Sequence, residues 1–113
     1  MRFEELLGDV EVLELRGDPG VDVSSVEHDS RSVRSGACFA CIPGAVTDGH
    51  LHAPSAVRAG AVALLVERPL DLGVAEARVE SVREAWAAAF DGESLDSRGR
   101  SKPALAAALA FFQ

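Results

Sequence analysis

Two short polar segments of this chain carry side chains that can bind an anion or a nucleotide. The first is the triplet Asp29-Ser30-Arg31, which lies just ahead of an apolar run that predicts a buried strand. A hydroxyl and a guanidinium group can meet a phosphate or the edge of a uracil ring. Asp and Ser in loops also commonly hydrogen-bond nearby backbone groups. The triplet therefore predicts either a ligand contact or a brace within the loop.

The second segment, residues 43–50, places Gly44 and Gly49 around a loop of small residues. Glycine lets backbone N–H groups approach an anion closely. Tight turns ask for glycine for a different reason, so anion binding and turn geometry both remain open from the spacing alone.

Cys38 and Cys41 have the C-x-x-C spacing found in redox and zinc sites. No second pair accompanies them, and residues three apart in a strand point to opposite faces. We therefore predict two buried, unreactive thiols.

The three histidines, His28, His50 and His52, together with Asp48 supply enough donors for a metal ion. A histidine pair two residues apart in a loop is not a recognised ligand spacing, so no metal site is predicted. The sequence also shows no nucleophile–base–orienter triad and no G-x-x-x-x-G-K-[ST] phosphate loop. No catalytic residue is assigned, and hydrolysis of a nucleoside triphosphate by this chain alone is not expected.

The elements that must position these residues alternate between helix and strand. Helices are predicted at residues 3–7 and 52–59 and from Ser81 onward, where S-V-R-E is a capping box and Trp86 falls on the apolar face. Gly92 is expected to end the last helix. Strands are predicted at 10–15, 21–26, 37–42 and 61–66, with a short edge strand at 77–79. This alternation indicates an α/β domain with a mixed β-sheet and flanking helices.

Length and charge narrow the classes of function. The chain has 113 residues, 11.9 kDa and a formal charge of −7, which fits one small globular domain. Net acidity argues against non-specific binding to nucleic acid or anionic membrane. The sequence shows no secretory signal and no apolar run long enough to span a bilayer, so a cytoplasmic location with reduced thiols is expected.

Residues 92–113 differ in character from the rest. Residues 93–101 contain a single apolar side chain, Leu95, and are predicted to be a linker. Residues 103–113 could form a short helix with Leu105, Leu109 and Phe112 on one side. We therefore divide the chain into a domain at 1–91 and a linker with an atypical tail at 92–113.

Taken together, residues 28–44, 48–50 and 56–67 resemble the N-terminal domain of the Mur ligases, most closely the MurE type, UDP-N-acetylmuramoyl-tripeptide synthetase. The resemblance lies in a D-S-R triplet, a G-x-x-F strand, a P-G turn, D-G-H and a G-A-x-A strand. It implies a cytoplasmic step of peptidoglycan synthesis, in which a ligase uses ATP and Mg²⁺ to add an amino acid to UDP-N-acetylmuramoyl-L-alanyl-D-glutamate.

The resemblance also implies where the uridine diphosphate end of that substrate would bind. The positions matching the uridine-site pattern of the family are His28, Ser30, Ala45, Val46 and Thr47. The positions that belong to the motif and support it are Asp29, Arg31, Gly44, Asp48 and Gly49. Ser30 and Thr47 can offer hydroxyl contacts, whereas Ala45 and Val46 can offer only backbone groups and apolar surface.

After Phe90 a family member would reach a strand and the G-T-N-G-K-T loop of an ATP-binding central domain, followed by a C-terminal domain. Neither is expected here, so the chain is interpreted as a fragment that holds no cofactor itself and relies on those two domains as partners. Two alternatives stay open: a stand-alone interaction module that binds a partner protein through residues 104–112, or a non-functional truncated product with a frameshifted tail.

Overall fold

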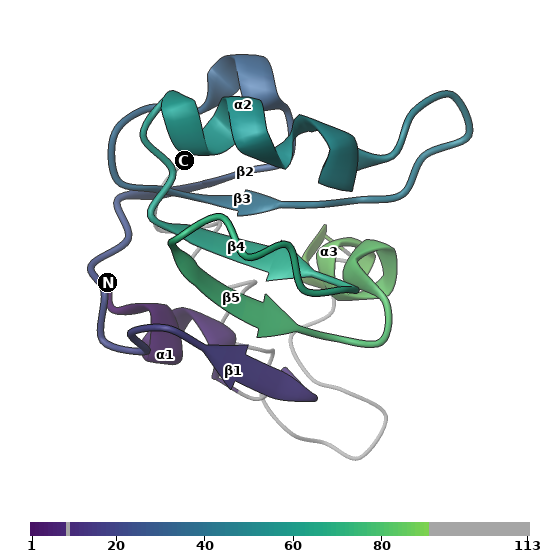
Figure 1. Cartoon of the computed structure of the whole chain (residues 1–113). Helices are drawn as coiled ribbons and strands as arrows, with labels where there is room; N and C mark the ends of the chain where they lie inside the picture. The colour runs from purple at the N-terminus through teal and green to yellow at the C-terminus, as the bar shows by residue number, and fades with distance from the viewer. Residues whose placement is uncertain (9, 91–113) are drawn as a thin grey trace.

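The computed structural model describes residues 1–8 and 10–90, with side chains placed through Trp86. Within that part of the chain, five strands form one sheet in the order β1-β5-β4-β3-β2 (Figure 1). The strands are β1 (Glu14–Arg16), β2 (Ser25–Glu27), β3 (Ala37–Ala40), β4 (Ala63–Val66) and β5 (Ala75–Arg78). β1 runs antiparallel to β5, and all other neighbours are parallel. The predicted α/β domain with a mixed sheet is confirmed.

Helices cover both faces of this sheet. The helical elements are α1 (Phe3–Leu7), η1 (Ser30–Ser32), η2 (Gly49–His52), α2 (Ala53–Arg58) and α3 (Val82–Phe90). Phe3 of α1 and Val82 of α3 pack in one apolar cluster, whereas Ala56 of α2 packs in the other. Figure 1 shows α2 lying along the β3 side of the sheet, with β1 at the opposite end.

β3 and β4 are buried at every position. Parallel strands covered on both faces read as continuous apolar runs, which is why both could be predicted from sequence. The faces alternate along β3: Cys38 packs in the cluster with α1 and α3, and Phe39 packs in the cluster with α2. Two small apolar layers therefore hold the central strands on either side.

The two cysteines lie on opposite faces, as predicted. Cys38 and Cys41 belong to different apolar clusters, and both thiols are reduced and buried. Burial raises the pKa of both thiols, and that of Cys41 reaches about 12. A thiol with so high a pKa is a poor nucleophile, so the prediction of unreactive cysteines is supported.

All four strands predicted at 10–15, 21–26, 37–42 and 61–66 are shorter in the structure, and the first two begin four residues later than predicted. Val10 donates its N–H to Leu7 O at 2.7 Å, and this turn delays the first strand until Glu14. Val23 donates to Met1 O at 2.7 Å, so residues 21–23 pair with the N-terminal segment before β2 begins. Alternation predicted extended chain at both places but could not identify the hydrogen-bond partner.

The prediction of an edge strand at 77–79 was wrong. β5 spans Ala75–Arg78 and lies between β1 and β4, and it is buried through Ala77. β1 covers the edge of β5, and the N–H of Leu13 extends that pairing to Arg78 O at 2.7 Å. An interior position requires a partner on each side, and the partner from residues 13–16 is remote in sequence.

The helix predictions hold with small shifts. The helix predicted at 52–59 is α2, with Pro54 in its first turn, preceded by the 3₁₀ turn η2. The N–H of Glu84 donates to Ser81 Oγ at 3.1 Å, which is the predicted cap of α3. Gly92, the linker and the tail at 92–113 lie outside the described residues. None of the helices in the described part has the length and apolar character needed to cross a membrane.

Candidate functional site

A cavity of about 540 Å³ opens where β2 and β3 end. In α/β folds, ligands bind outside the carboxyl ends of the parallel strands, which is the edge where this cavity lies. Nine residues line it: His28, Asp29, Ser30, Arg31, Phe39, Ile42, Thr47, Gly49 and His52.

The 3₁₀ turn η1 forms one wall of the cavity. Asp29 caps it by accepting from Arg31 N at 3.0 Å, and the same carboxylate accepts from Arg31 Nε at 3.0 Å and from Nη2 at 2.8 Å. The hydrogen bonds from the side chain and the backbone of Arg31 lower the pKa of Asp29 to about 2. Arg31 is nevertheless 88% exposed, so its guanidinium faces solvent beside the cavity.

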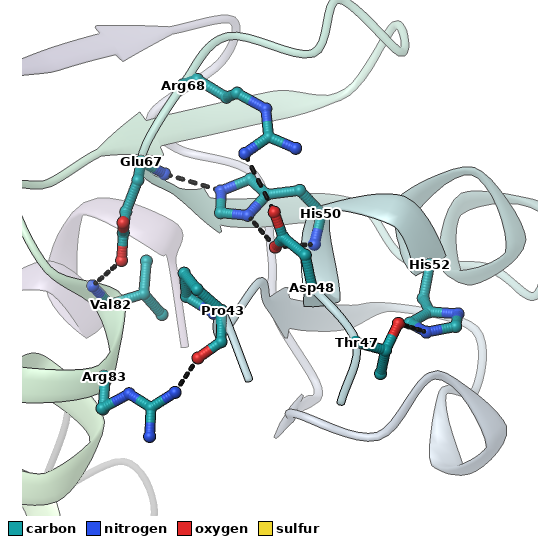
Figure 2. A network of polar contacts seen from close by, with 9 residues as sticks. All are labelled: Pro43, Thr47, Asp48, His50, His52, Glu67, Arg68, Val82 and Arg83. Carbon is teal, nitrogen blue, oxygen red and sulfur yellow. Dashed lines mark hydrogen bonds and ion pairs between the residues drawn. The ribbon is translucent and has the colours of Figure 1, made fainter. Parts of the chain in front are cut away.

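The 3₁₀ turn η2 also borders the cavity, through Gly49 and His52, and repeats the same capping. Asp48 Oδ1 accepts from His50 N at 2.9 Å and lies 2.7 Å from His50 Nδ1. The N–H of Glu67 donates to His50 Nε2 at 2.9 Å (Figure 2). A backbone N–H can only donate, so Nε2 is the acceptor and the ring proton sits on Nδ1, where it donates to Asp48.

The Asp48 carboxylate is held from two directions. Its second oxygen accepts from Arg68 Nη1 at 3.1 Å. The hydrogen bonds from the backbone and ring of His50, followed by that from Arg68, lower the pKa of Asp48 to about 2. This carboxylate is therefore ionised and bonded on both oxygens at neutral pH.

Between the two turns, residues 43–48 form a tight reversal that we call the cavity loop. Pro43 and Asp48 form an isolated antiparallel β-bridge, and Gly44 donates its N–H to Thr47 O at 2.9 Å. A Cβ on Gly44 would lie 2.7 Å from Thr47 O, so the structure favours turn geometry as the reason for glycine at this position. Val46, at the tip, is 99% exposed. At the base, Thr47 Oγ1 and His52 Nε2 are 3.0 Å apart.

Gly49 is required by a close approach between two backbone segments. A Cβ placed on it would lie 2.6 Å from Ile42 N, and its own N–H donates to Ile42 O at 3.0 Å. The D-G-H segment therefore packs directly against the end of β3, which brings Thr47 to the cavity.

The profile of the Mur ligase family, catalytic domain, matches residues 22–98 of this chain. The chain belongs to the Mur ligase family. The match spans β2 to β5 and includes both capped turns, so the cavity lies within it. The family resemblance inferred from the D-S-R and D-G-H motifs is confirmed.

Two curated Mur ligases are similar in sequence to this chain. The chain is 35% identical over 91 residues to the UDP-N-acetylmuramoyl-L-alanyl-D-glutamate–2,6-diaminopimelate ligase of Listeria innocua, covering 80% of this chain and 18% of that protein. It is 46% identical over 71 residues to the enzyme of the same name from Halalkalibacterium halodurans, covering 63% and 14%. The chain thus spans less than a fifth of the length of these relatives.

Solved Mur ligase structures share the fold. MurF from Acinetobacter baumannii aligns with a TM-score of 0.55 and 28% identity over 60% of this chain and 16% of that one. MurF from Thermotoga maritima, in complex with ADP, aligns with a TM-score of 0.51 and 29% identity over 62% and 16%.

In this Mur ligase chain the structure brings together some of the sequence-predicted site residues and separates others. Six of them line the cavity: His28, Asp29, Ser30, Arg31, Thr47 and Gly49. Gly44, Ala45, Val46 and Asp48 do not line it. Ala45 and Val46 are exposed at the tip of the cavity loop, and Asp48 is directed toward His50 and Arg68.

Sequence reasoning missed three lining residues. Phe39 and Ile42 supply apolar lining from β3 and its end, and His52 comes from the last position of η2. Phe39 looked like ordinary core, and its ring is indeed 1% exposed. The G-x-x-F spacing in the strand and the histidine after D-G-H were the available signals, but neither specified a cavity.

The predicted core position of Trp86 holds only in part. Trp86 is half-buried and packs against the cluster that contains α1 and α3. Its ring also meets His28 edge to face, with centroids 4.9 Å apart and planes inclined by 62°. His28 is therefore oriented by an aromatic side chain from α3 where it lines the cavity.

Two features bear on Mg²⁺ and the phosphates of ATP: the metal-ligating side chains in the described part of the chain and the sequence motifs. Within residues 1–8 and 10–90, no group of three or more His, Cys, Asp or Glu side chains could hold a metal ion. The 113-residue sequence also contains no G-x-x-x-x-G-K-[ST] segment.

Proposed function

We propose that this Mur ligase chain binds the nucleotide end of UDP-N-acetylmuramoyl-L-alanyl-D-glutamate and serves peptidoglycan synthesis by positioning that substrate. The observation that carries the proposal is the cavity at the carboxyl edge of the sheet, which residues of both capped turns line. The relatives named above act, by their names, on this UDP-linked peptide.

The lining residues match the chemistry of a uridine nucleotide. Ser30 and Thr47 offer hydroxyl groups, and the half-buried Ile42 offers apolar surface just after β3. Arg31 provides a guanidinium close to the rim, which suits a diphosphate. His28, Ala45 and Val46 complete the uridine-site pattern, the latter two through backbone groups at the loop tip.

Binding at the nucleotide end would contribute to ligation by positioning. A substrate anchored at the uridine diphosphate presents its D-glutamyl carboxylate in a restricted volume, which reduces the entropy cost of the reaction. ATP and Mg²⁺ belong, in this proposal, to other domains of a full-length ligase, and the location is the cytoplasm. The 1–91 domain boundary is part of the same proposal.

The test is a two-dimensional amide NMR titration of residues 1–113 with UDP-N-acetylmuramoyl-L-alanyl-D-glutamate, UMP and AMP. We expect saturable shifts at Ser30, Thr47 and Gly49 with both uridine ligands and none with AMP. A dispersed spectrum without saturable shifts would contradict the proposal.

A double variant sharpens this test. Ser30→Ala combined with Thr47→Ala should weaken binding of the uridine ligands about tenfold, since each lost hydrogen bond costs a factor of a few. Ser32→Ala is the matched control, because Ser32 belongs to the same turn but does not line the cavity. Equal affinities of the double variant and the control would place the nucleotide elsewhere.

A further inference from the structure

His50 is the one histidine of the described chain that is buried, with 3% of its surface exposed. Both of its ring nitrogens are hydrogen-bonded, Nδ1 to Asp48 and Nε2 to the N–H of Glu67. A buried imidazole with both nitrogens satisfied has a single allowed orientation and tautomer. His50 therefore joins the cavity loop rigidly to the residue that follows β4.

Glu67 extends this connection to α3. Its Oε2 accepts from Val82 N at 2.9 Å, which satisfies the first backbone N–H of that helix. Figure 2 shows the resulting path from Asp48 through His50 and Glu67 to Val82. The path crosses three separate segments, η2, the end of β4 and α3, without a gap.

A second contact joins the other end of the cavity loop to the same helix. Arg83 Nη2 donates to the carbonyl oxygen of Pro43. The loop is thus attached to the first turn of α3 at both of its ends, directly at Pro43 and through His50 and Glu67 at Asp48 (Figure 2). Thr47, which lines the cavity, lies between these two attachments.

We infer that His50 is a positioning residue, which holds the cavity loop against α3 so that ligand binding at the cavity is coupled to the first turn of that helix. The inference rests on the proposed uridine site. It adds to that site His50, which does not line the cavity, and the first turn of α3. Coupling of this kind is reciprocal. If ligand binding shifts the equilibrium of the first turn of α3 by some factor, a change in that turn alters the ligand affinity by the same factor.

Two substitutions separate the hydrogen bond of His50 Nδ1 from that of His50 Nε2. In His50→Asn the amide nitrogen takes the place of Nδ1, which keeps a donor for Asp48 and removes the acceptor for Glu67 N–H. In His50→Gln the amide oxygen reaches toward the place of Nε2, which keeps that acceptor and gives up the donor to Asp48. Ser55→Ala, on the exposed side of α2, is the control.

The experiment titrates residues 1–113 and each variant with UMP and follows the amides of Thr47 and Val82. In the wild-type chain both amides should shift with the same dissociation constant. His50→Asn should bind UMP about fivefold more weakly, as expected for one lost hydrogen bond. Its shift at Val82 should be smaller than in the wild type, with the Arg83–Pro43 contact still in place. His50→Gln should retain the Val82 shift.

The outcomes distinguish this inference from the proposed function. A folded His50→Asn variant with wild-type affinity and an unchanged Val82 shift would overturn the inference while leaving the uridine site in place. If the wild-type chain binds no uridine ligand, the proposed function fails. The amide hydrogen exchange of Val82 in ligand-free protein then decides: equal exchange rates in wild type and His50→Asn overturn the link to α3.

Discussion

The two walls of the cavity are built from the same local motif but differ in burial. In D-S-R and in D-G-H, an aspartate caps a 3₁₀ turn and accepts a second hydrogen bond from the side chain two residues on. The side chain of Arg31 is 88% exposed, whereas that of His50 is fully buried. The side chain of Arg31 hydrogen-bonds only to Asp29 among the described contacts. His50, in contrast, also accepts from the N–H of Glu67, whose carboxylate accepts from the first N–H of α3. Burial therefore turns a local brace into a connection between distant elements.

The largest contrast is expected from removing the side chain that each aspartate holds. His50→Ala leaves Asp48 and Glu67 N–H without their partner and opens a small void, so it should lower the free energy of unfolding by about 2–4 kcal/mol. Arg31→Ala should leave the urea midpoint nearly unchanged, because that side chain is in solvent. Urea denaturation followed by circular dichroism measures both. Similar midpoints for the two variants would contradict the comparison.

Substitution of the middle residue of each motif should also cost more in D-G-H than in D-S-R. Gly49→Ser places a Cβ about 2.6 Å from Ile42 N and should cost about 1–3 kcal/mol in unfolding free energy. Ser30→Gly should cost less than about 1 kcal/mol, from the added backbone freedom alone. Thermal denaturation of the two variants is the measurement, and a tolerated Gly49→Ser would show that the approach to Ile42 can relax.

The smallest contrast is in the response to acid and salt. Both aspartates have a pKa of about 2 in the folded chain, below the ordinary value of 3.8. The stability they contribute is therefore present above pH 3.8 and is lost as the pH falls through about 2. Added salt should raise the pKa of Asp29 more than that of Asp48, because the charged side chain of Arg31 is the main cause at Asp29, whereas the backbone N–H of His50 is the main cause at Asp48. Carboxyl NMR titrations at low and high salt check this, and equal salt shifts would contradict it.

Much of the central sheet could be predicted because its signals are local. The apolar runs at 37–42 and 61–66 have the length and continuity of buried parallel strands, and β3 and β4 lie within them. Cys38 and Cys41 fall on opposite faces because the side-chain period of a strand is two residues. These features depend only on neighbours along the chain.

Strands β1 and β5 were harder to predict from sequence, because they pair with each other across a long separation in the chain. The alternating residues 10–15 do not say that only Glu14 onward pairs, nor that the partner is β5. The short apolar segment near residue 77 looked like an edge until β1 covered it. Its interior place depends on a strand some sixty residues earlier along the chain, a separation no local pattern reports.

For the candidate site, the sequence by itself determined the turns. An aspartate two residues before a backbone N–H that it can cap, and a glycine where two backbones meet, are local requirements, and they mark residues 29–31 and 48–50. Only the tertiary structure decided which turn is buried, that residues of both turns line one cavity, and that Ala45 and Val46 are exposed and do not line it. The reason is physical: His50 acquires its role from Glu67, which follows β4, and only the folded sheet brings that N–H to the imidazole.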